Sequence, residues 1–328
     1  MGFLNATPYV ALDFAVTDHE GRAVVVAIVK ATFDIQQGKA TLAEEQIPLR
    51  ANDVPLNVEN PMGSIQFASD LCHIKHGADV LVVGEAVSRS AVKSLDVSVK
   101  VASKALTVRV FGDRQFVQGA SDIVVGAALP FERMPIVYER AYGGMTEDLT
   151  EIEERNPAGV GVAKKKKDLV GRPAPQVEHP SLPHKTANDK HPPIGLGPIM
   201  THWLPRRSYA GTFDETWKTT RMPMMPADYN IKYNNCAHPS LVFDNPLAPG
   251  DPVSVLGMHE DGLLAFDIPN WKAVARARFE HKGKVTIPLG VDTLVLHPND
   301  KRFEMVGRYA FPVGRGGDVL RELSVDFA

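Results

Sequence analysis

The sequence predicts a mainly β protein with sandwich- or barrel-like sheets, a long proline-rich irregular connector and little helix. Short runs of β-branched and alternating apolar residues recur in residues 1–145 and again in residues 206–328, separated by turn signals. Between these regions prolines are frequent, and patterns typical of long helices are scarce throughout. At 328 residues the chain can form one large core or two ordinary domains.

Four segments of the N-terminal β-rich region, residues 1–145, are predicted strands. "AVVVAIVKATFDI" is rich in β-branched residues and is followed by the turn "QQGKA". "DVLVVGEAV" is a second strand, and "MPIVYERAY" a further one that ends at a pair of glycines. "LDVSVKVASKALTVRVFGD" alternates apolar and polar residues on both sides of "ASKA", which predicts a hairpin. These segments are residues 23–35, 79–87, 134–142 and 95–113.

Residues 146–205 are predicted to be a connector that wraps the surface. "TEDLTEIEER" has a pattern compatible with two or three helical turns, and nine prolines follow it. Each proline lacks a backbone donor, so the segment cannot form a central strand or a long helix. We interpret the lysine run Lys164 to Lys167 as part of a solvated loop.

The C-terminal β-rich region, residues 206–328, is expected to hold three hairpins, and it can pack with the first region as one domain. "DPVSVLGMHEDGLLAFDIP" turns at "HEDG", "ARARFEHKGKVTIPL" at "HKGK", and "DTLVLHPNDKRFEMVGRYAF" at "HPND".

Composition and charge indicate a cytoplasmic protein with no nucleic-acid partner and no membrane insertion. The net charge is −3, and the lysine run is the only basic cluster. The two cysteines provide no disulfide framework, and the N-terminus lacks the features of a signal peptide. The longest apolar run, Ala23 to Val29, is far shorter than the roughly 18 residues that indicate a membrane span.

The sequence predicts no metal site and no cofactor. "CHIKH" brings Cys72, His73 and His76 together, but no second ligand pair follows, as zinc sites require. We interpret Cys236, two residues before His238, as a small buried thiol. Neither a nucleophile elbow nor a phosphate-binding loop is present. Three further histidines lie in the connector at irregular spacing: His179, His184 and His191.

Carboxylates in the segment "RSYAGTFDETWKTTRMPMMPADYN" allow two interpretations. Asp214, Glu215 and Asp228 have the chemistry of an acid/base pair for hydrolysis, with Trp217 available to stack on a sugar. Alternatively, Asp214 is the N-cap of a short helix "ETWKTT", with Glu215 in its first turn. The second interpretation explains the spacing without further assumptions.

Six segments, in order, resemble a bacterial family long catalogued only as a domain of unknown function, whose genes commonly lie beside type VI secretion genes. The resemblance spans nearly the whole chain, and "DTLVLHPNDKRFEMVGR" near the end also looks familial. Family members look like adaptors or chaperones that load toxic effectors onto the secretion spike. The segments are "ASDLCHIKHGADVLVVGEA" (68–86), "VFGDRQF" (110–116), "MPIVYERAYGG" (134–144), "NPAGVG" (156–161), "PPIGLGPIMTHWLPRR" (192–207) and "YAGTFDETWKTTRMPMMPADYN" (209–230).

The resemblance implies a non-enzymatic adaptor whose partners are a secreted effector and a spike protein. The chain departs from the family pattern in two places: "VA" and the lysine run follow the "NPAGVG" turn, and the segment "NNCAHPSL" diverges. Such segments are where the choice of effector can differ between family members. We expect the adaptor to hold an N-terminal segment of the effector, and an exposed strand edge is one route to such binding. Two rival functions remain: a hydrolase of cell-wall sugar or peptide, and a structural component of the secretion machine.

A cluster of aromatic and basic residues in one short region provides candidate partner contacts, because Trp, Tyr and Arg are frequent at interface hot spots. For the tryptophans an anchoring role in the core is an equal alternative. For the arginines we favour ties from guanidinium groups to loop carbonyls, or to Glu139 and Asp214. The candidates are Trp203, Arg206, Arg207, Tyr209, Trp217, Arg221 and Tyr229, and the residues with predicted structural roles are Glu139, Arg140, Gly143, Gly144 and Asp214.

Overall fold

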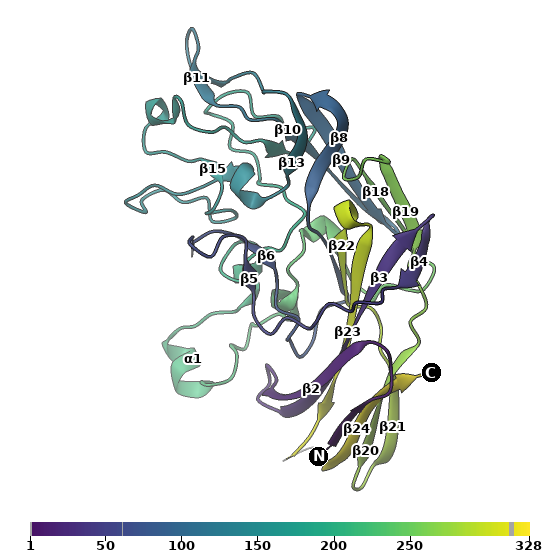
Figure 1. Ribbon diagram of the computed structural model, residues 1–328. Helices are drawn as coiled ribbons and strands as arrows, with labels where there is room; N and C mark the ends of the chain where they lie inside the picture. Colours follow the sequence, from purple (N-terminus) through teal and green to yellow (C-terminus); the bar gives the residue numbers. More distant parts are fainter. Residues whose placement is uncertain (1, 61, 315–317) are drawn as a thin grey trace.

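The computed structural model describes residues 2–60, 62–314 and 318–328 and is mainly β, as predicted (Figure 1). Strands make up 44% of the chain and helical segments 8%. In these residues the one α-helix is α1 (Glu215–Thr220), and the other helical segments are short 3-10 turns. These turns are η1 (Tyr138–Arg140), η2 (Lys166–Leu169), η3 (Arg206–Tyr209), η4 (Ile231–Asn234), η5 (Pro239–Leu241) and η6 (Pro298–Asp300).

A seven-stranded sheet forms the centre of the molecule and joins strands from both ends of the chain. Its longest pairing is between β3 and β23, which run antiparallel from Asp34 opposite Arg302 to Val24 opposite Pro312. In spatial order the sheet contains β17 (Val242–Phe243), β7 (Ala78–Val82), β22 (Thr293–His297), β23 (Arg302–Pro312), β3 (Ala23–Gln36) and β2 (Val10–Thr17), with β4 (Lys39–Leu42) also paired to β3.

Two further sheets pack around this centre. The edge strands β1, β19 and β21 all carry exposed residues. The five-stranded sheet contains β16 (Val177–Glu178), β10 (Lys104–Phe111), β9 (Ser94–Val101), β18 (Pro252–Leu256) and β19 (Leu263–Asp267). The four-stranded sheet contains β1 (Gly2–Asn5), β24 (Leu320–Phe327), β20 (Ala273–Phe279) and β21 (Gly283–Pro288).

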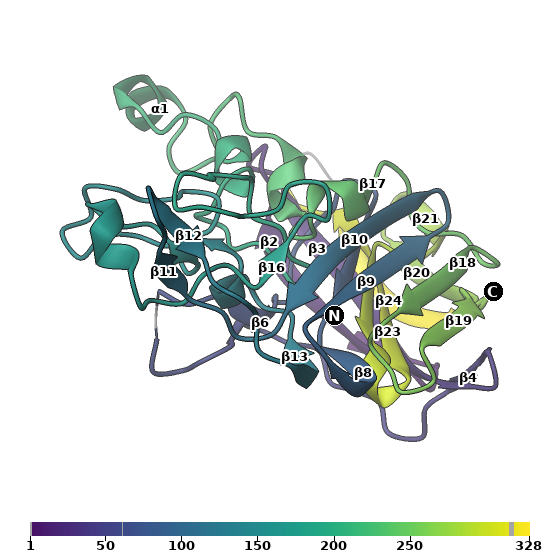
Figure 2. The same ribbon diagram turned by 90° about the horizontal axis from the view of Figure 1, so that it is seen from above.

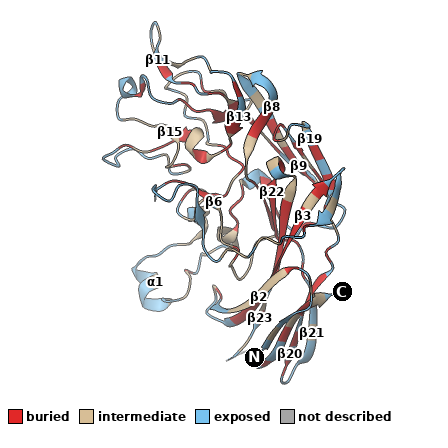
Figure 3. Cartoon of the chain, in the orientation of Figure 1, coloured by how far each residue is buried: buried red, intermediate tan, exposed pale blue. Residues whose placement is uncertain are grey.

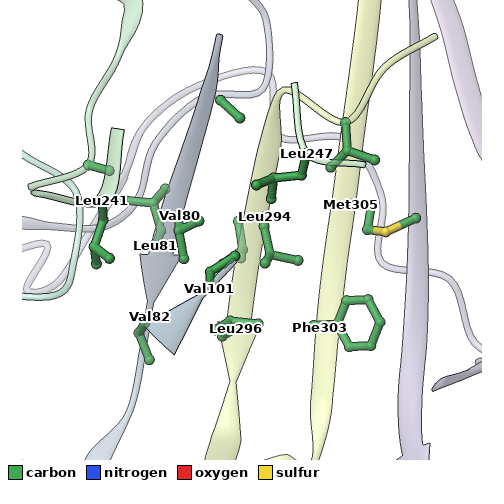
Figure 4. Packing of buried hydrophobic residues seen from close by; sticks show 14 of the residues in the cluster. Val80, Leu81, Val82, Val101, Leu241, Leu247, Leu294, Leu296, Phe303 and Met305 are labelled. Carbon is green, nitrogen blue, oxygen red and sulfur yellow. The ribbon is translucent and has the colours of Figure 1, made fainter. Parts of the chain in front are cut away.

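The main hydrophobic core lies between these sheets, so the architecture is sandwich-like. Figure 4 shows Val101 of β9 among Val80, Leu294 and Leu296 of the seven-stranded sheet. All four side chains are at most 2% exposed. In the described residues each of the three large sheets ends in edge strands, and none closes into a barrel. Of the two predicted forms, the protein therefore has the sandwich-like one.

The hairpins predicted from alternation are confirmed. β9 and β10 pair from Val101 opposite Lys104, and the valines predicted to face one side, Val97 and Val99, are fully buried. β3 turns into β4 through residues with positive φ at Gln37 and Gly38. The pairs β18–β19, β20–β21 and β22–β23 form the three C-terminal hairpins. Strands β1, β2 and β24 were not predicted.

Three predicted elements are wrong in detail. The strand predicted at 79–87 is two strands, β7 and β8 (Glu85–Val92), because Gly84 breaks the chain direction with φ at 146°. The strand predicted at 134–142 ends at Pro135, where β13 (Phe131–Pro135) is followed by η1. "TEDLTEIEER" forms no helix. Instead the Thr146 hydroxyl accepts a hydrogen bond from the Glu151 amide, a local bond that competes with helix formation.

The connector, residues 146–205, has little regular structure, as its prolines predict. The two-residue strands β15 and β16 and the turn η2 are its regular elements. With neighbouring segments it builds a lobe that Figure 2 shows beside the main sheets. The two-stranded sheets outside the large ones are β5 (Val54–Pro55) with β6 (Ile65–Phe67), β8 with β13, β11 (Phe116–Gln118) with β12 (Ile123–Val125), and β14 (Tyr142–Gly143) with β15 (Val160–Gly161).

The face of the seven-stranded sheet opposite the core holds a buried ionic cluster. Lys30 Nζ lies 2.9 Å from Asp70 Oδ2 and 2.6 Å from Glu304 Oε2. Arg50 donates two hydrogen bonds of 2.7 Å to Glu304, and His297 Nε2 lies 2.7 Å from the same carboxylate. Such a cluster is stable only when each charge is paired, so the segment that carries Arg50 and Asp70 is held firmly against the sheet.

Candidate functional site

The segment that carries Asp214, Trp217 and Asp228 forms a projecting arm, which we define as residues 209–230. Its base is closed where the Asn230 amide donates a 3.0 Å hydrogen bond to the Tyr209 carbonyl. Figures 1 and 2 show its helix α1 standing away from the sheets. The body beneath it is the rigid β framework, so the arm is positioned by a fixed scaffold.

Hydrogen bonds inside the arm fix its shape. Asp214 Oδ1 accepts from the Trp217 amide at 2.7 Å, so the predicted N-cap of α1 is confirmed. Asp228 accepts from both the amide and the hydroxyl of Thr212, at 2.9 and 2.8 Å. The Trp217 indole donates to the Met224 carbonyl at 2.8 Å. A partner that binds the arm therefore meets a loop whose conformation is already set.

The tip of the arm exposes large apolar side chains. Phe213 is 51% exposed and Met222 63%, and the Phe213 ring packs edge-on against the half-buried Trp217 with ring centres 4.8 Å apart. Figure 3 shows α1 as one of the most exposed parts of the chain. Neither Phe213 nor Met222 was among the predicted contacts, although the methionine-rich "RMPMMP" was a signal for an adaptable binding surface.

The base of the arm packs on the turn between β2 and β3. The Tyr229 ring lies 5.5 Å from the ring of His19, and His19 Nδ1 lies 3.3 Å from His73 Nε2. Burial raises the pKa of the Tyr229 hydroxyl to about 12, so this residue is neutral at the junction. A side chain at Gly21 would come within 2.5 Å of Met224 Sδ, which shows how closely arm and turn approach.

The remaining predicted contacts divide between surface and interior. Trp203 is fully buried and therefore serves as the anchor rather than as a surface contact. The Arg206 guanidinium donates to the carbonyls of Tyr233 and Ile199, at 2.7 and 2.8 Å. Arg207, on the surface, pairs with Glu154 at 2.8 Å. In the arm, Arg221 donates to the carbonyl of Met225, and Tyr209 is half-buried.

The preference for arginine ties to loop carbonyls agrees with these contacts, but the proposed acidic partners were wrong. Glu139 accepts hydrogen bonds from the amide and hydroxyl of Ser64, at 2.8 to 2.9 Å. Asp214 is occupied by the helix N-terminus. Arg140 pairs with Asp113 at 2.9 Å instead. Glu139 and Asp214 were proposed because they lie near the arginines in the sequence. In the folded chain the acidic partners come from distant segments instead.

Two of the familial segments interlock through Gly143 and Gly144. Both have positive φ, at 154° and 105°, as expected for turn glycines. A Cβ on Gly143 would lie 2.1 Å from the carbonyl oxygen of Asn156, in the segment "NPAGVG". The side-chain amide nitrogen of the buried Asn156 in turn donates to the backbone carbonyls of Tyr138 and Tyr142, at 2.8 and 3.0 Å. These residues hold the framework together.

The carboxylates of the hydrolase alternative are occupied by structural bonds. Asp214 caps α1, and Glu215 pairs with Lys218 on the helix surface. Hydrogen bonds from the Thr212 amide and hydroxyl lower the pKa of Asp228, so near neutral pH this carboxylate is ionised and holds no proton to donate. A general acid for glycoside hydrolysis needs the opposite shift.

The cysteine and histidine residues considered as ligands face different partners. Cys72 Sγ lies 2.7 Å from Arg308 Nη1, His73 contacts His19, and His76 Nε2 lies 3.1 Å from Asp244. Burial raises the pKa of the Cys236 thiol to about 11, in agreement with its interpretation as a buried thiol. Burial outweighs the charges of Lys75 and Arg206, which act to lower this pKa, whereas a nucleophilic cysteine needs the lowered value.

The lysine run is partly tied to the connector. Lys164 pairs with Asp148 at 2.8 Å, and Lys166 contacts the Asn188 side chain. Within the described ranges, no helix combines the length and apolar character needed to cross a membrane.

Comparison with known proteins places the chain in a family. Residues 20–308, well over half of the chain, match a family described as "Uncharacterized protein conserved in bacteria (DUF2169)". No curated protein and no solved structure matches the chain. The protein therefore belongs to the bacterial family DUF2169.

Proposed function

We propose that this protein is a non-enzymatic adaptor of type VI secretion, which binds a cognate toxic effector in the cytoplasm and helps to load it onto the secretion spike. The observation that carries the binding role is the arm: a pre-shaped projection with exposed Phe213 and Met222 on a rigid β body. Apolar anchors held in one conformation lose little entropy on association and are typical of protein interfaces. The secretion setting rests on the resemblance of the familial segments.

A free strand edge is the second feature that supports protein binding. β21 has one unpaired side in the described chain, an edge of the kind to which an extended partner segment can add a strand. The N-terminal segment of an effector is the occupant we favour. The hydrolase alternative loses support because Asp214 and Asp228 are held by structural bonds.

The experiment that tests the function is an affinity pull-down of the tagged protein from its host, with mass spectrometry of the retained proteins. Genes neighbouring its own are co-expressed so that partners are present. Recovery of one toxin-like protein together with a spike protein supports the loading role. Failure to retain any secretion protein contradicts the loading role, and measurable hydrolysis of cell-wall material that Asp228→Asn abolishes in a folded protein would favour the hydrolase.

A further inference from the structure

A pocket of about 180 Å³ lies where the arm joins the body. Tyr209 at the start of the arm lines it together with Pro205 and Arg206, which precede the arm, and Val242 lines it from β17. A water needs about 10 to 15 Å³ of such space, so the pocket has room for several waters or for one side chain of moderate size.

The pocket combines apolar lining with an excess of positive charge. Besides Arg206, the side chains of Lys104 and Lys232 line it, against the single carboxylate of Asp244 in the described lining. Lys104 Nζ contacts the Val242 carbonyl and lies 5.2 Å from the centre of the Phe243 ring. Among the described residues, no acidic side chain forms an ion pair with Lys232 Nζ.

The single carboxylate of Asp244 offsets only part of the charge of Lys104, Arg206 and Lys232. Its side chain is 80% exposed and already hydrogen-bonded to His76 at 3.1 Å. That bond, together with the charges of His76, Lys104 and Lys232, lowers the pKa of Asp244. The same positive field acts on any other carboxylate that enters the pocket.

We propose that this pocket binds the free C-terminal carboxylate of a partner polypeptide whose last residue is apolar. An internal glutamate would satisfy the lysines but leave the apolar lining unfilled, and an internal leucine would do the reverse. A C-terminal apolar residue carries both groups on one carbon, so it places its side chain against Val242 and its carboxylate near Lys232. The inference rests on the proposed protein-binding function and specifies which end of a partner is recognised.

The test is an NMR titration of the full-length, ¹⁵N-labelled protein with three probes. The first is an N-acetylated tetrapeptide Gly-Ser-Gly-Leu with a free carboxylate, and the second is the same peptide amidated. The third is the amidated peptide Gly-Glu-Leu-Gly, which offers an internal acid. We expect the free-acid peptide to bind about tenfold more tightly than either amide, as loss of a charge-assisted bond predicts, with shifts at the amides of Lys232 and Asn235.

Three variants locate the carboxylate. Lys232→Gln removes a charge from a half-buried side chain with no ion pair in the described chain, and it should abolish the preference for the free acid. Lys93→Gln, at an exposed lysine between β8 and β9 outside the pocket, should leave it unchanged. Asp244→Asn removes the competing negative charge and should tighten binding of the free-acid peptide.

Equal binding of the free-acid and amidated peptides would overturn the inference, and so would tighter binding of the internal glutamate. Failure here is distinguishable from failure of the adaptor role. If the pull-down recovers an effector while the peptides show no preference, only the C-terminal inference is wrong. If the free-acid peptide binds as expected and the pull-down recovers no secretion protein, the pocket stands and the adaptor role does not.

Discussion

The indole of Trp203 meets the ring of Tyr138 edge-on, with ring centres 5.4 Å apart and planes at 86°. Trp203 has no exposed surface, and its contact joins two familial segments that lie far apart in the sequence. Gly195, in the same segment as Trp203, lies so close that a Cβ there would be 2.7 Å from the Tyr138 ring. The contact therefore anchors the connector to the body beneath the arm.

Replacing Trp203 should destabilise the whole protein. Trp203→Ala removes a fully buried indole and is expected to lower the free energy of unfolding by about 3 to 5 kcal/mol. Trp217→Ala, at a half-buried position on the arm, should cost clearly less. Urea unfolding monitored by circular dichroism measures both. A smaller loss for Trp203→Ala than for Trp217→Ala would contradict the anchoring role.

Gly143 should not tolerate a side chain. Gly143→Ala adds a Cβ 2.1 Å from a backbone oxygen at a positive φ, so we expect a loss of about 2 to 5 kcal/mol. Gly171→Ala is the matched control: its φ is 80°, but the space around it is open. It should cost only the backbone strain, about 1 to 2 kcal/mol. Equal melting temperatures for the two variants would refute the steric argument.

Asp214 should act as a cap and not as an acid. Asp214→Ala is expected to destabilise the arm by about 1 kcal/mol, whereas Asp214→Asn should preserve it because asparagine caps helices equally well. Hydrogen exchange of the α1 amides measures the difference. Partner binding should follow the same order. If Asp214→Asn abolished hydrolysis of cell-wall material while the α1 amides stayed protected from exchange, the carboxylate itself would be required and the hydrolase would be favoured.

The buried cluster around Glu304 should make stability depend on pH. Burial alone would raise the pKa of Glu304, but hydrogen bonds from His297 and Arg50 and the charge of Lys30 outweigh it and hold that pKa well below its usual range. The stabilisation is therefore fully present above the unfolded pKa of about 4.3 and is lost as pH falls below it.

Urea unfolding between pH 7 and pH 3 tests this dependence. The wild type should lose stability as pH falls through the acidic end of this range, and Glu304→Gln should show a flatter profile at a lower overall stability, since it leaves buried cations without their partner. Parallel profiles for the two proteins would show that the pH dependence arises elsewhere.

Local patterns in the sequence predicted much of the fold. The hairpin of β9 and β10 and the cap at Asp214 depend on residues close together in the chain, and both were predicted with nearly the observed bounds. The helix expected at 146–155 failed because side-chain bonds such as that of Thr146 compete with helical ones.

Features that depend on distant segments were not predictable. The sequence could not distinguish Trp203 from Trp217, because the ring that buries Trp203 comes from residue 138. The cluster of Lys30, Asp70 and Glu304 likewise joins residues from two strands and the segment that covers them. The pocket at the arm base escaped notice because its two lysines lie far apart in the chain.

The most direct test of the account compares partner capture by two double variants. Phe213→Ala with Met222→Ala trims the exposed tip of the arm, and Leu129→Ala with Leu149→Ala trims two similarly exposed apolar residues elsewhere. Quantitative mass spectrometry of parallel pull-downs should show effector recovery reduced at least about tenfold for the arm variant, as expected when hot-spot side chains are removed. The control variant should match the wild type. Undiminished recovery by a folded arm variant would contradict the claim that the arm binds the effector.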